Sequence, residues 1–278
     1  MSPQSDTQNT SVEATLARLG TAARRKDLIL GGLTDWDLAQ AVASGRVRKV
    51  ERSVFALPNA SERDLHLAAH KAYLDCFNRA EQLGLWVLHA PEAIHVATAH
   101  GRPVPGCFVH RIRGQLTLWD VLRHCVKCGT DIEALCVMES AVVLKECSLG
   151  QLRSNFQRRN DSRARRIIDM IDPQSQSIAE TSGRYHLIKA GYNVQGQAAI
   201  RGMGHLDLLV EGVLGIETDG EKYHNTAKAW AEDLRRYNVL AIRGVPTLHI
   251  RASDALYHPQ SMLDLVRMAL QAINSAHR

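Results

Sequence analysis

The spacing of apolar positions changes from helical to strand-like several times along the chain, and these changes predict its elements. Apolar side chains recur at helical spacing in three short segments, residues 11–23, 24–32 and 33–45, and the third has Thr34 as a candidate N-cap. Residues 46–58 alternate between apolar and charged positions, which is typical of two strands joined by a turn. After a lead of residues 1–12 that we expect to be disordered, this order predicts a winged helix-turn-helix over 13–60. A small helical cap with a hairpin is the alternative.

The middle of the chain, residues 61–175, predicts a mixed helical and strand connector without a motif that carries chemistry. We expect helices over 62–84, 117–129 and 131–146, with strands at 93–99 and 107–113 around a Gly/Pro turn. Histidines alternate with apolar residues in and beside these strands, so we interpret them as structural, at positions 95, 100 and 110.

From residue 177 onward the pattern gives a clear order of helix, three strands, helix, strand and helix. The segments are 177–191, 192–200, 205–211, 213–218, 225–244, 247–251 and 259–276. Such an order builds a mixed sheet with helices on its faces. The predicted fold class is therefore α/β in this domain, residues 176–278, and α+β for the whole chain.

Three acids interrupt the second and third of these strands. Asp207 lies in one strand of a hairpin, and Glu217 and Asp219 lie at the end of the other. Neighbouring strands run about 4.8 Å apart, and residues at i and i+2 point to the same side. Because the flanking residues are apolar, burying an unpaired carboxylate here would cost roughly several kcal/mol of folding free energy. Oxygen ligands favour Mg²⁺ or Mn²⁺, so we predict a site for one of these ions. Exposed acids in a turn are the alternative, a fair one for Asp219 and a poor one for Glu217.

Charge and cysteine content add weaker constraints. The net charge of +5 and pI of about 9.0 permit a nucleic-acid partner without requiring one. No run of about 18 apolar residues and no secretory signal is found, so we expect a cytoplasmic protein without a membrane partner. We expect the six cysteines to be reduced thiols in the core. Cys125 and Cys128 form a CxxC pair with no second pair at similar spacing, so zinc is not expected there.

Basic residues gather in two places. The predicted wing carries a cluster suited to phosphate contacts, formed by Arg46, Arg48, Lys49 and Arg52. Asp35 and Asp37, at the start of the candidate recognition helix, would repel phosphates. The segment 151–166 has six arginines, including Arg158 and Arg159, and is either a solvated helix face or a phosphate-contacting surface.

Four stretches of the C-terminal segment together resemble a known family. "AETSGRYHLIKAGY", "HLDLLV", "IETDGEKYH" and "EDLRRYNVLAIRG" are similar, in this order, to the DUF559 domain, a branch of the PD-(D/E)XK nucleases related to very-short-patch-repair endonucleases. The resemblance covers about residues 177–272. It implies Mg²⁺-dependent cleavage of DNA, with Asp207 and Glu217 as metal ligands and Asp219 as an added acid. Asp219 stands where the superfamily has a lysine.

The same resemblance assigns further residues. His224 matches the histidine of the "DGxxYH" element, Glu180 the acid of the first helix, and Asp233 with Arg236 the "DxxR" of the long helix. Each has a simpler alternative, since Glu180 follows Ser177 at capping-box spacing and the other side chains could sit at a helix start or on a helix surface. The zinc ligands of the repair endonucleases have no counterpart here, because cysteine is absent from 177–278.

The N-terminal part resembles the first domain of AbiEi-type antitoxins, over residues 15–58 and more loosely to 175. Two functions follow. The chain is expected to be a DNA-binding, divalent-metal-dependent endonuclease, or else a DNA-binding regulator whose nuclease-like domain is inert. A homodimer and a partner from a toxin or defence system are left open.

Overall fold

The computed structural model describes residues 11–51, 53–219 and 227–276, and of residues 227–229 the backbone alone. The chain divides into two compact units. The first comprises residues up to Asp75 with Pro91–Thr117, and the second comprises Cys76–Ala90 with Leu118 onward. Within the described parts, no helix combines the length and the hydropathy needed to cross a bilayer.

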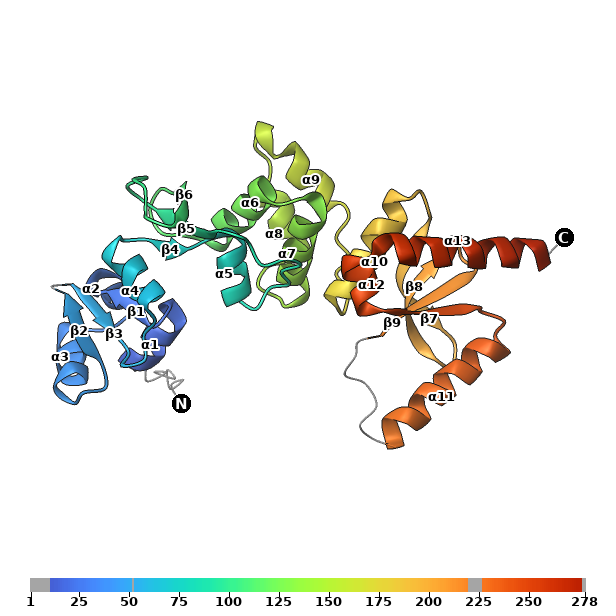
Figure 1. The fold of residues 1–278 in the computed structure, drawn as a ribbon, viewed down its shortest axis with the longest axis horizontal. Helices are drawn as coiled ribbons and strands as arrows, with labels where there is room; N and C mark the ends of the chain where they lie inside the picture. Colours follow the sequence, from blue (N-terminus) through green and yellow to red (C-terminus); the bar gives the residue numbers. More distant parts are fainter. Residues whose placement is uncertain (1–10, 52, 220–226, 277–278) are drawn as a thin grey trace, which may run out of the picture. The chain divides into compact units, whose positions relative to one another are not determined.

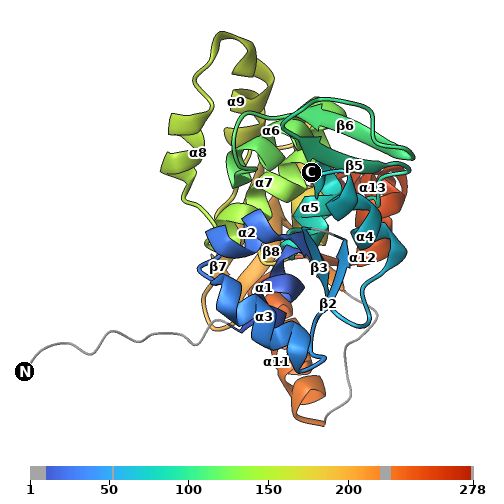
Figure 2. The same ribbon diagram turned by 90° about the vertical axis from the view of Figure 1, so that its left-hand side faces the viewer.

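The first unit begins with three helices and a three-stranded sheet. Their order is α1 (Val12–Leu19), β1 (Ala22–Arg24), α2 (Arg25–Leu30), α3 (Asp35–Ala43), β2 (Arg48–Glu51) and β3 (Val54–Ala56). The strands pair in the order β1-β3-β2, and β2 and β3 lie side by side next to α3 (Figure 2). The three predicted helices and the two strands predicted over 46–58 are confirmed.

The prediction that the first helix runs to residue 23 was wrong, because α1 ends at Leu19 and β1 begins at Ala22. Gly20 ends α1 in the left-handed conformation, with φ 113°, and Thr21 follows at φ 63°. Two successive positive φ values break the helix and turn the chain into the sheet.

The rest of the first unit holds α4 (Glu62–Ala69) and a small sheet of β4 (Tyr73–Leu74), β5 (Ile94–Thr98) and β6 (Cys107–Arg111). The predicted strands are confirmed, and β5 and β6 run parallel. The single helix predicted over 62–84 was wrong. Lys71 and Cys76 both have positive φ, 55° and 53°, and the chain between them forms β4.

The second unit opens with a group of helices. These are α5 (Cys76–Gln82), α6 (Leu118–Cys128), α7 (Asp131–Val143), α8 (Leu149–Asn155), a 3₁₀ turn (Arg159–Asp161) and α9 (Ser162–Ile168). The N-cap Thr130 and Glu133 form a complete capping box, which fixes where α7 begins. The helices predicted over 117–129 and 131–146 are confirmed.

The C-terminal domain of this unit has the predicted order with one added helix. It runs α10 (Ile178–Lys189), β7 (Val194–Ile200), β8 (Gly204–Val210), β9 (Leu214–Asp219), α11 (Ala227–Ile242), β10 (Thr247–Arg251), α12 (Ala252–Tyr257) and α13 (Pro259–Ala276). The sheet order is β10-β9-β8-β7, with β10 parallel to β9 and the other pairs antiparallel. The predicted mixed sheet is therefore confirmed, and α12 was missed.

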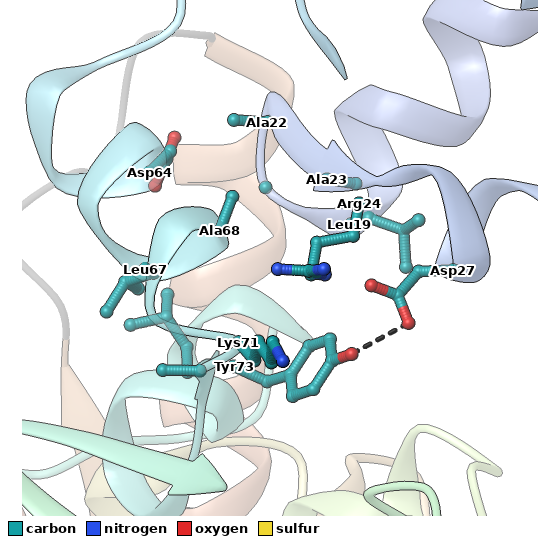
Figure 3. Close-up of a pocket in the computed structure, with 13 residues that line it drawn as sticks. Leu19, Ala22, Ala23, Arg24, Asp27, Asp64, Leu67, Ala68, Lys71 and Tyr73 are labelled. Carbon is teal, nitrogen blue, oxygen red and sulfur yellow. Dashed lines mark hydrogen bonds between the residues drawn. The ribbon is translucent and has the colours of Figure 1, made fainter. Parts of the chain in front are cut away.

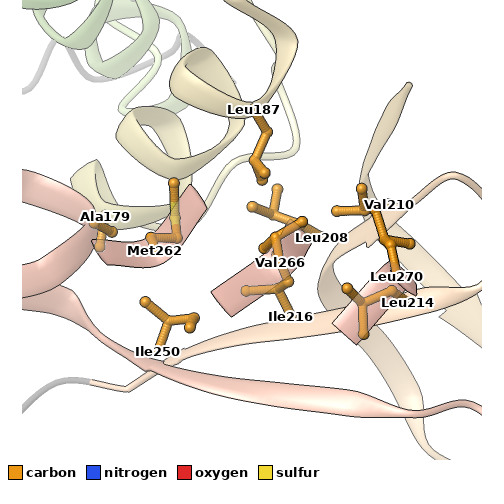
Figure 4. Close-up of a cluster of buried hydrophobic side chains, with 11 residues drawn as sticks. Ala179, Leu187, Leu208, Val210, Leu214, Ile216, Ile250, Met262, Val266 and Leu270 are labelled. Carbon is orange, nitrogen blue, oxygen red and sulfur yellow. The ribbon is translucent and has the colours of Figure 1, made fainter. Parts of the chain in front are cut away.

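Helices cover both faces of this sheet, with α10, α12 and α13 on one side and α11 on the other (Figure 1). On the first side, Leu208, Ile216 and Ile250 from three strands pack against Met262 and Val266 of α13 (Figure 4). All five side chains are at most 2% exposed. This apolar layer fixes β8, β9 and β10, and Glu217 of β9 contacts Arg236 of α11 on the other side of the sheet.

Candidate active site

Asp207 lies where the β8–β9 ladder stops. The ladder pairs Leu208 with Ile216 as its last recorded pair, and the Asp207 carboxylate then accepts two hydrogen bonds from Thr218. These come from the backbone N–H at 2.8 Å and from the hydroxyl at 2.9 Å. The carboxylate thus satisfies a backbone donor at the point where the strands separate.

Glu217 lies on the neighbouring strand in a half-buried setting. Its Oε1 accepts a hydrogen bond of 2.9 Å from the Arg236 guanidinium of α11, which also donates to the His205 carbonyl at 3.0 Å. Burial, followed by repulsion from Asp207, raises the pKa of Glu217 to about 7, although Arg236 acts in the opposite direction. The structure therefore brings Asp207, Glu217 and Arg236 into one electrostatically coupled group.

Glu180 joins this group from α10. It is 5% exposed, and its Oε2 accepts hydrogen bonds from Gln197 Nε2 at 2.7 Å and from the Gln176 backbone N–H at 3.0 Å. Burial raises the pKa of Glu180, and the charge of Asp207 raises it further. Ser177 does cap the helix, accepting from the Glu180 N–H, but the Glu180 side chain reaches Gln176 instead of closing a capping box.

Asp219 faces two aromatic side chains that the sequence did not single out. His249 of β10 lies 2.9 Å from the Asp219 carboxylate through Nδ1, and its ring meets that of Tyr237 of α11 edge-on, with centroids 4.6 Å apart. His249 is also the register partner of Glu217 in the parallel β9–β10 pair. The sequence could have indicated His249 only through the pairing of β10 with β9, because that pairing places His249 beside Glu217.

Two of the predicted site residues lie outside the described part of the chain. These are His224 of the predicted catalytic group and Arg52 of the predicted wing cluster. Their assignments remain predictions.

The other wing residues are on the surface of the first unit. Arg48 and Lys49 are exposed on β2, and Arg46 pairs with Glu13 at 2.7 Å. The acids that argued against a DNA contact are engaged locally. Asp35 accepts from Arg25 at 2.6 Å, and Asp37 closes the capping box of α3 with Thr34, which lowers the pKa of both carboxyls.

The arginines of residues 151–166 separate into two kinds. Arg158 and Arg159 are exposed. Arg163 donates to Asp131 at 2.7 Å and to two backbone carbonyls, and Arg165 donates to the carbonyl of Phe156 at 3.3 Å. The latter two arginines hold the helical group together, so part of this charge run is structural.

The first unit has a pocket of its own. Residues of α1, β1 and α4 line it, and the hydroxyl of Tyr73 donates to Asp27 at 2.7 Å across its rim (Figure 3). Burial raises the pKa of Tyr73. The pocket has a volume of about 30 Å³, which is room for one or two water molecules, so it does not suit a nucleotide.

The carboxylates suit a divalent cation by their chemistry. Asp207 and Glu217 offer oxygen atoms, and the charge of Asp207 disfavours the ionised form of Glu217, a cost that a cation would remove. The donor set is that of Mg²⁺ or Mn²⁺ rather than of zinc.

Comparison with protein families gives one match. Residues 182–270, about a third of the chain, match the restriction-endonuclease-like family model REase_MTES_1575. The match contains Asp207, Glu217, Arg236 and His249, so the C-terminal domain is nuclease-like. Searches of curated proteins and of solved structures gave no significant match.

Proposed function

We propose that the protein is a DNA-binding, divalent-metal-dependent phosphodiesterase. The observation that carries this is the coupling of Asp207 and Glu217 at the open end of the β8–β9 ladder, inside the nuclease-like domain. A half-buried pair of acids in which one raises the pKa of the other is costly to a fold, and groups with such raised pKa values gather at functional sites.

Asp207 and Glu217 would hold Mg²⁺ or Mn²⁺, with Asp219 as the further acid. When bound there, the ion supplies Lewis acidity toward a phosphate oxygen and lowers the pKa of a coordinated water. The fit rests on the carboxylate oxygens and on the repulsion by which Asp207 raises the pKa of Glu217.

The chain's own groups divide the remaining work. The Arg236 guanidinium lies beside Glu217 and is suited to neutralise charge that develops on a phosphate. Asp219 and His224 are the proposed proton acceptors. Gln197 and Gln176 hold the Glu180 carboxyl by hydrogen bonds, and Glu180 is electrostatically coupled to Asp207. We assign Glu180 the role of positioning Asp207.

DNA would be held by positive charge on the surface. Arg48 and Lys49 expose their side chains on the wing strand, and Arg158 and Arg159 do so in the helical group. Such groups contact phosphates without reading sequence, so we expect binding that is strong at low salt and weakly selective.

Purified protein incubated with supercoiled plasmid, linear duplex and single-stranded DNA tests the proposal. Each is treated with Mg²⁺, Mn²⁺ or EDTA. We expect nicking or cleavage of at least one substrate with metal and none with EDTA. Cleavage in EDTA would show metal-independent chemistry and overturn the assignment of Asp207 and Glu217.

The alternative is a DNA-binding regulator with an inert nuclease-like domain. One observation favours it, since Arg236 already places a cation against Glu217. The two functions differ in metal binding. A nuclease should gain thermal stability with Mg²⁺ or Mn²⁺, as any native-state ligand provides. DNA binding with neither cleavage nor metal-dependent stabilisation would establish the regulator.

A further inference from the structure

Three cysteine side chains meet in the helical group of the second unit. Cys125 and Cys128 lie one turn apart on α6, and Cys76 is the first residue of α5. The Cys76 thiol hydrogen bonds with both, and its sulfur lies within 4.8 Å of that of Cys128. Cys76 and Cys125 are fully buried, whereas Cys128 is exposed.

The local backbone is built for this meeting. Helices α5 and α6 pack against each other, and Gly129 at the end of α6 lies against the ring of Phe77. A Cβ at residue 129 would come within 2.4 Å of that ring, so glycine permits the close approach. Cys76 itself has φ 53°, a left-handed conformation that is costly for a side chain larger than glycine. Strained backbone that directs a side chain toward a cluster is typical of functional sites.

The other cysteines of this unit provide a contrast. Cys136 is buried in α7 and Cys147 follows that helix, and burial is the largest cause that raises the pKa of each, to about 11 for Cys147. For Cys76 the largest cause is instead the hydrogen bond with the Cys125 thiol. Cys136 and Cys147 behave as small apolar groups of the core, whereas Cys76, Cys125 and Cys128 form a group of sulfur donors.

We propose that Cys76, Cys125 and Cys128 bind a zinc ion that ties α5 to α6. Thiolates are the ligands that zinc prefers in structural sites, where it takes four donors. The three sulfurs supply three of these donors. The proposal does not depend on the nuclease activity, and it replaces the expectation that the CxxC pair binds no metal. That expectation failed to consider Cys76 because it lies about 50 residues upstream of the pair.

Metal content tests the proposal directly. Full-length protein, purified without chelators and freed of any tag, should contain about one zinc per chain by elemental analysis, in line with a single closed site. Cobalt exchanged for zinc should show the intense near-ultraviolet bands of thiolate-to-cobalt charge transfer. These bands report sulfur ligation independently of DNA cleavage.

Two single variants make the test sharp. Cys128→Ser is expected to fold, since the residue is exposed, and to lose most of its metal on dialysis with a weak chelator. Cys147→Ser, a cysteine of the same unit outside the cluster, should keep its zinc and its cobalt bands. Circular dichroism confirms that each variant is folded.

Three outcomes would overturn the proposal. One is folded wild-type protein from zinc-supplemented growth that contains no zinc. Another is full zinc retention by Cys128→Ser. The third is a Cys76–Cys128 disulfide found by mass mapping of protein purified under nitrogen, because oxidised sulfurs cannot serve as thiolate ligands.

Discussion

Asp207 shows how one side chain both shapes a sheet and prepares a site. By accepting from the Thr218 backbone, it takes the place of a ladder hydrogen bond and lets β8 and β9 diverge. The same carboxylate lies close enough to Glu217 to raise its pKa. A structural reason and a chemical reason for an acid at 207 therefore coincide, and variants must separate them.

Asp207→Asn separates the two roles. Asparagine can still accept from Thr218 through its amide oxygen, so the sheet should survive, while the charge that binds a cation is lost. We expect metal-dependent cleavage to fall by about 100-fold or more, because loss of a direct metal ligand should cost at least as much as loss of a residue that only orients a ligand. Initial rates of plasmid nicking measure this. Asp264→Asn, a partly exposed acid on α13, is the matched control and should cleave normally.

In EDTA, Glu217 should make the free energy of unfolding depend on pH. Its folded pKa of about 7 lies above the unfolded value near 4.5, so the folded state holds the proton more tightly. Stability from this group is fully present below about pH 4.5 and is lost as the pH rises through 7. Without metal, Glu217→Gln should therefore be more stable than wild type at pH 8, by at most roughly 3 kcal/mol.

Denaturant melts of both proteins at pH 5 and pH 8 measure this difference. The gain of Glu217→Gln should shrink at pH 5, and added Mg²⁺ should stabilise the wild type more than the variant at pH 8. An equal or smaller stability of the variant at pH 8 would contradict the raised pKa.

At the scale of elements, the sequence predicted most helices and strands because local signals and tertiary structure agree there. The capping residue Thr34 and the alternation of residues 46–58 each specify an element without help from distant parts of the chain. Failures occurred where one residue overrides a long pattern. Lys71 and Cys76 have side chains that a helix accepts, and nothing local reveals their left-handed backbone.

The candidate site was predictable in the same uneven way. Asp207 and Glu217 stand out because acids in apolar strands need a partner. His249 does not stand out, because it joins the site only through the pairing of β10 with β9. These two strands are separated in the sequence by α11. Gln197 was missed for the same reason, since its contact with Glu180 joins a strand to a helix N-terminus.

The wing strand β2 carries a prediction on DNA binding. Arg48→Ala with Lys49→Ala removes two exposed charges and should weaken duplex binding, lowering the slope of log affinity against log salt by about 1 to 2. Fluorescence anisotropy at several salt concentrations gives the slope. Arg102→Ala with Arg113→Ala removes equal charge from exposed loop positions of the same unit. A slope reduced equally by both pairs would show a general charge effect rather than a wing contact.

Gly215 of β9 tests the packing of the nuclease-like sheet. A Cβ at this position would lie 2.7 Å from Thr247 Oγ1 and 2.9 Å from Leu206 Cδ2. Gly215→Ala should therefore cost about 1 to 3 kcal/mol, as overpacking in cores does. Gly150→Ala is the control, since its nearest neighbour is 3.8 Å away in a helix and alanine favours helices. Chemical denaturation should show loss in the first variant and no loss in the second.

At the scale of the whole molecule, a buried charge pair joins the helical group to the nuclease-like domain within the second unit. Glu139 of α7 has no exposed surface, and it forms an ion pair with Arg184 of α10, whose side chain is 7% exposed. Glu139 also accepts from the Thr181 hydroxyl and, at 2.7 Å, from the Asp172 backbone N–H. Arg184 donates in turn to the Met170 carbonyl at 2.6 Å. Every partner is internal to the unit.

Such a network makes the two parts unfold together, and Glu139→Gln tests this. Removing one charge leaves the Arg184 guanidinium buried without its counterion, which costs about 3 to 5 kcal/mol. For a unit of this size we expect the melting temperature to fall by roughly 6 to 20 °C, still in one transition. Glu146→Gln, an exposed acid just after α7, should change stability by less than about 0.5 kcal/mol. Adding Arg184→Met to Glu139→Gln removes the stranded charge and should recover part of the loss, because the cost comes from the remaining ion and not from the missing bond. Two separate melting transitions in Glu139→Gln would show instead that the helical group and the nuclease-like domain are stable apart, and that the pair only fastens one to the other.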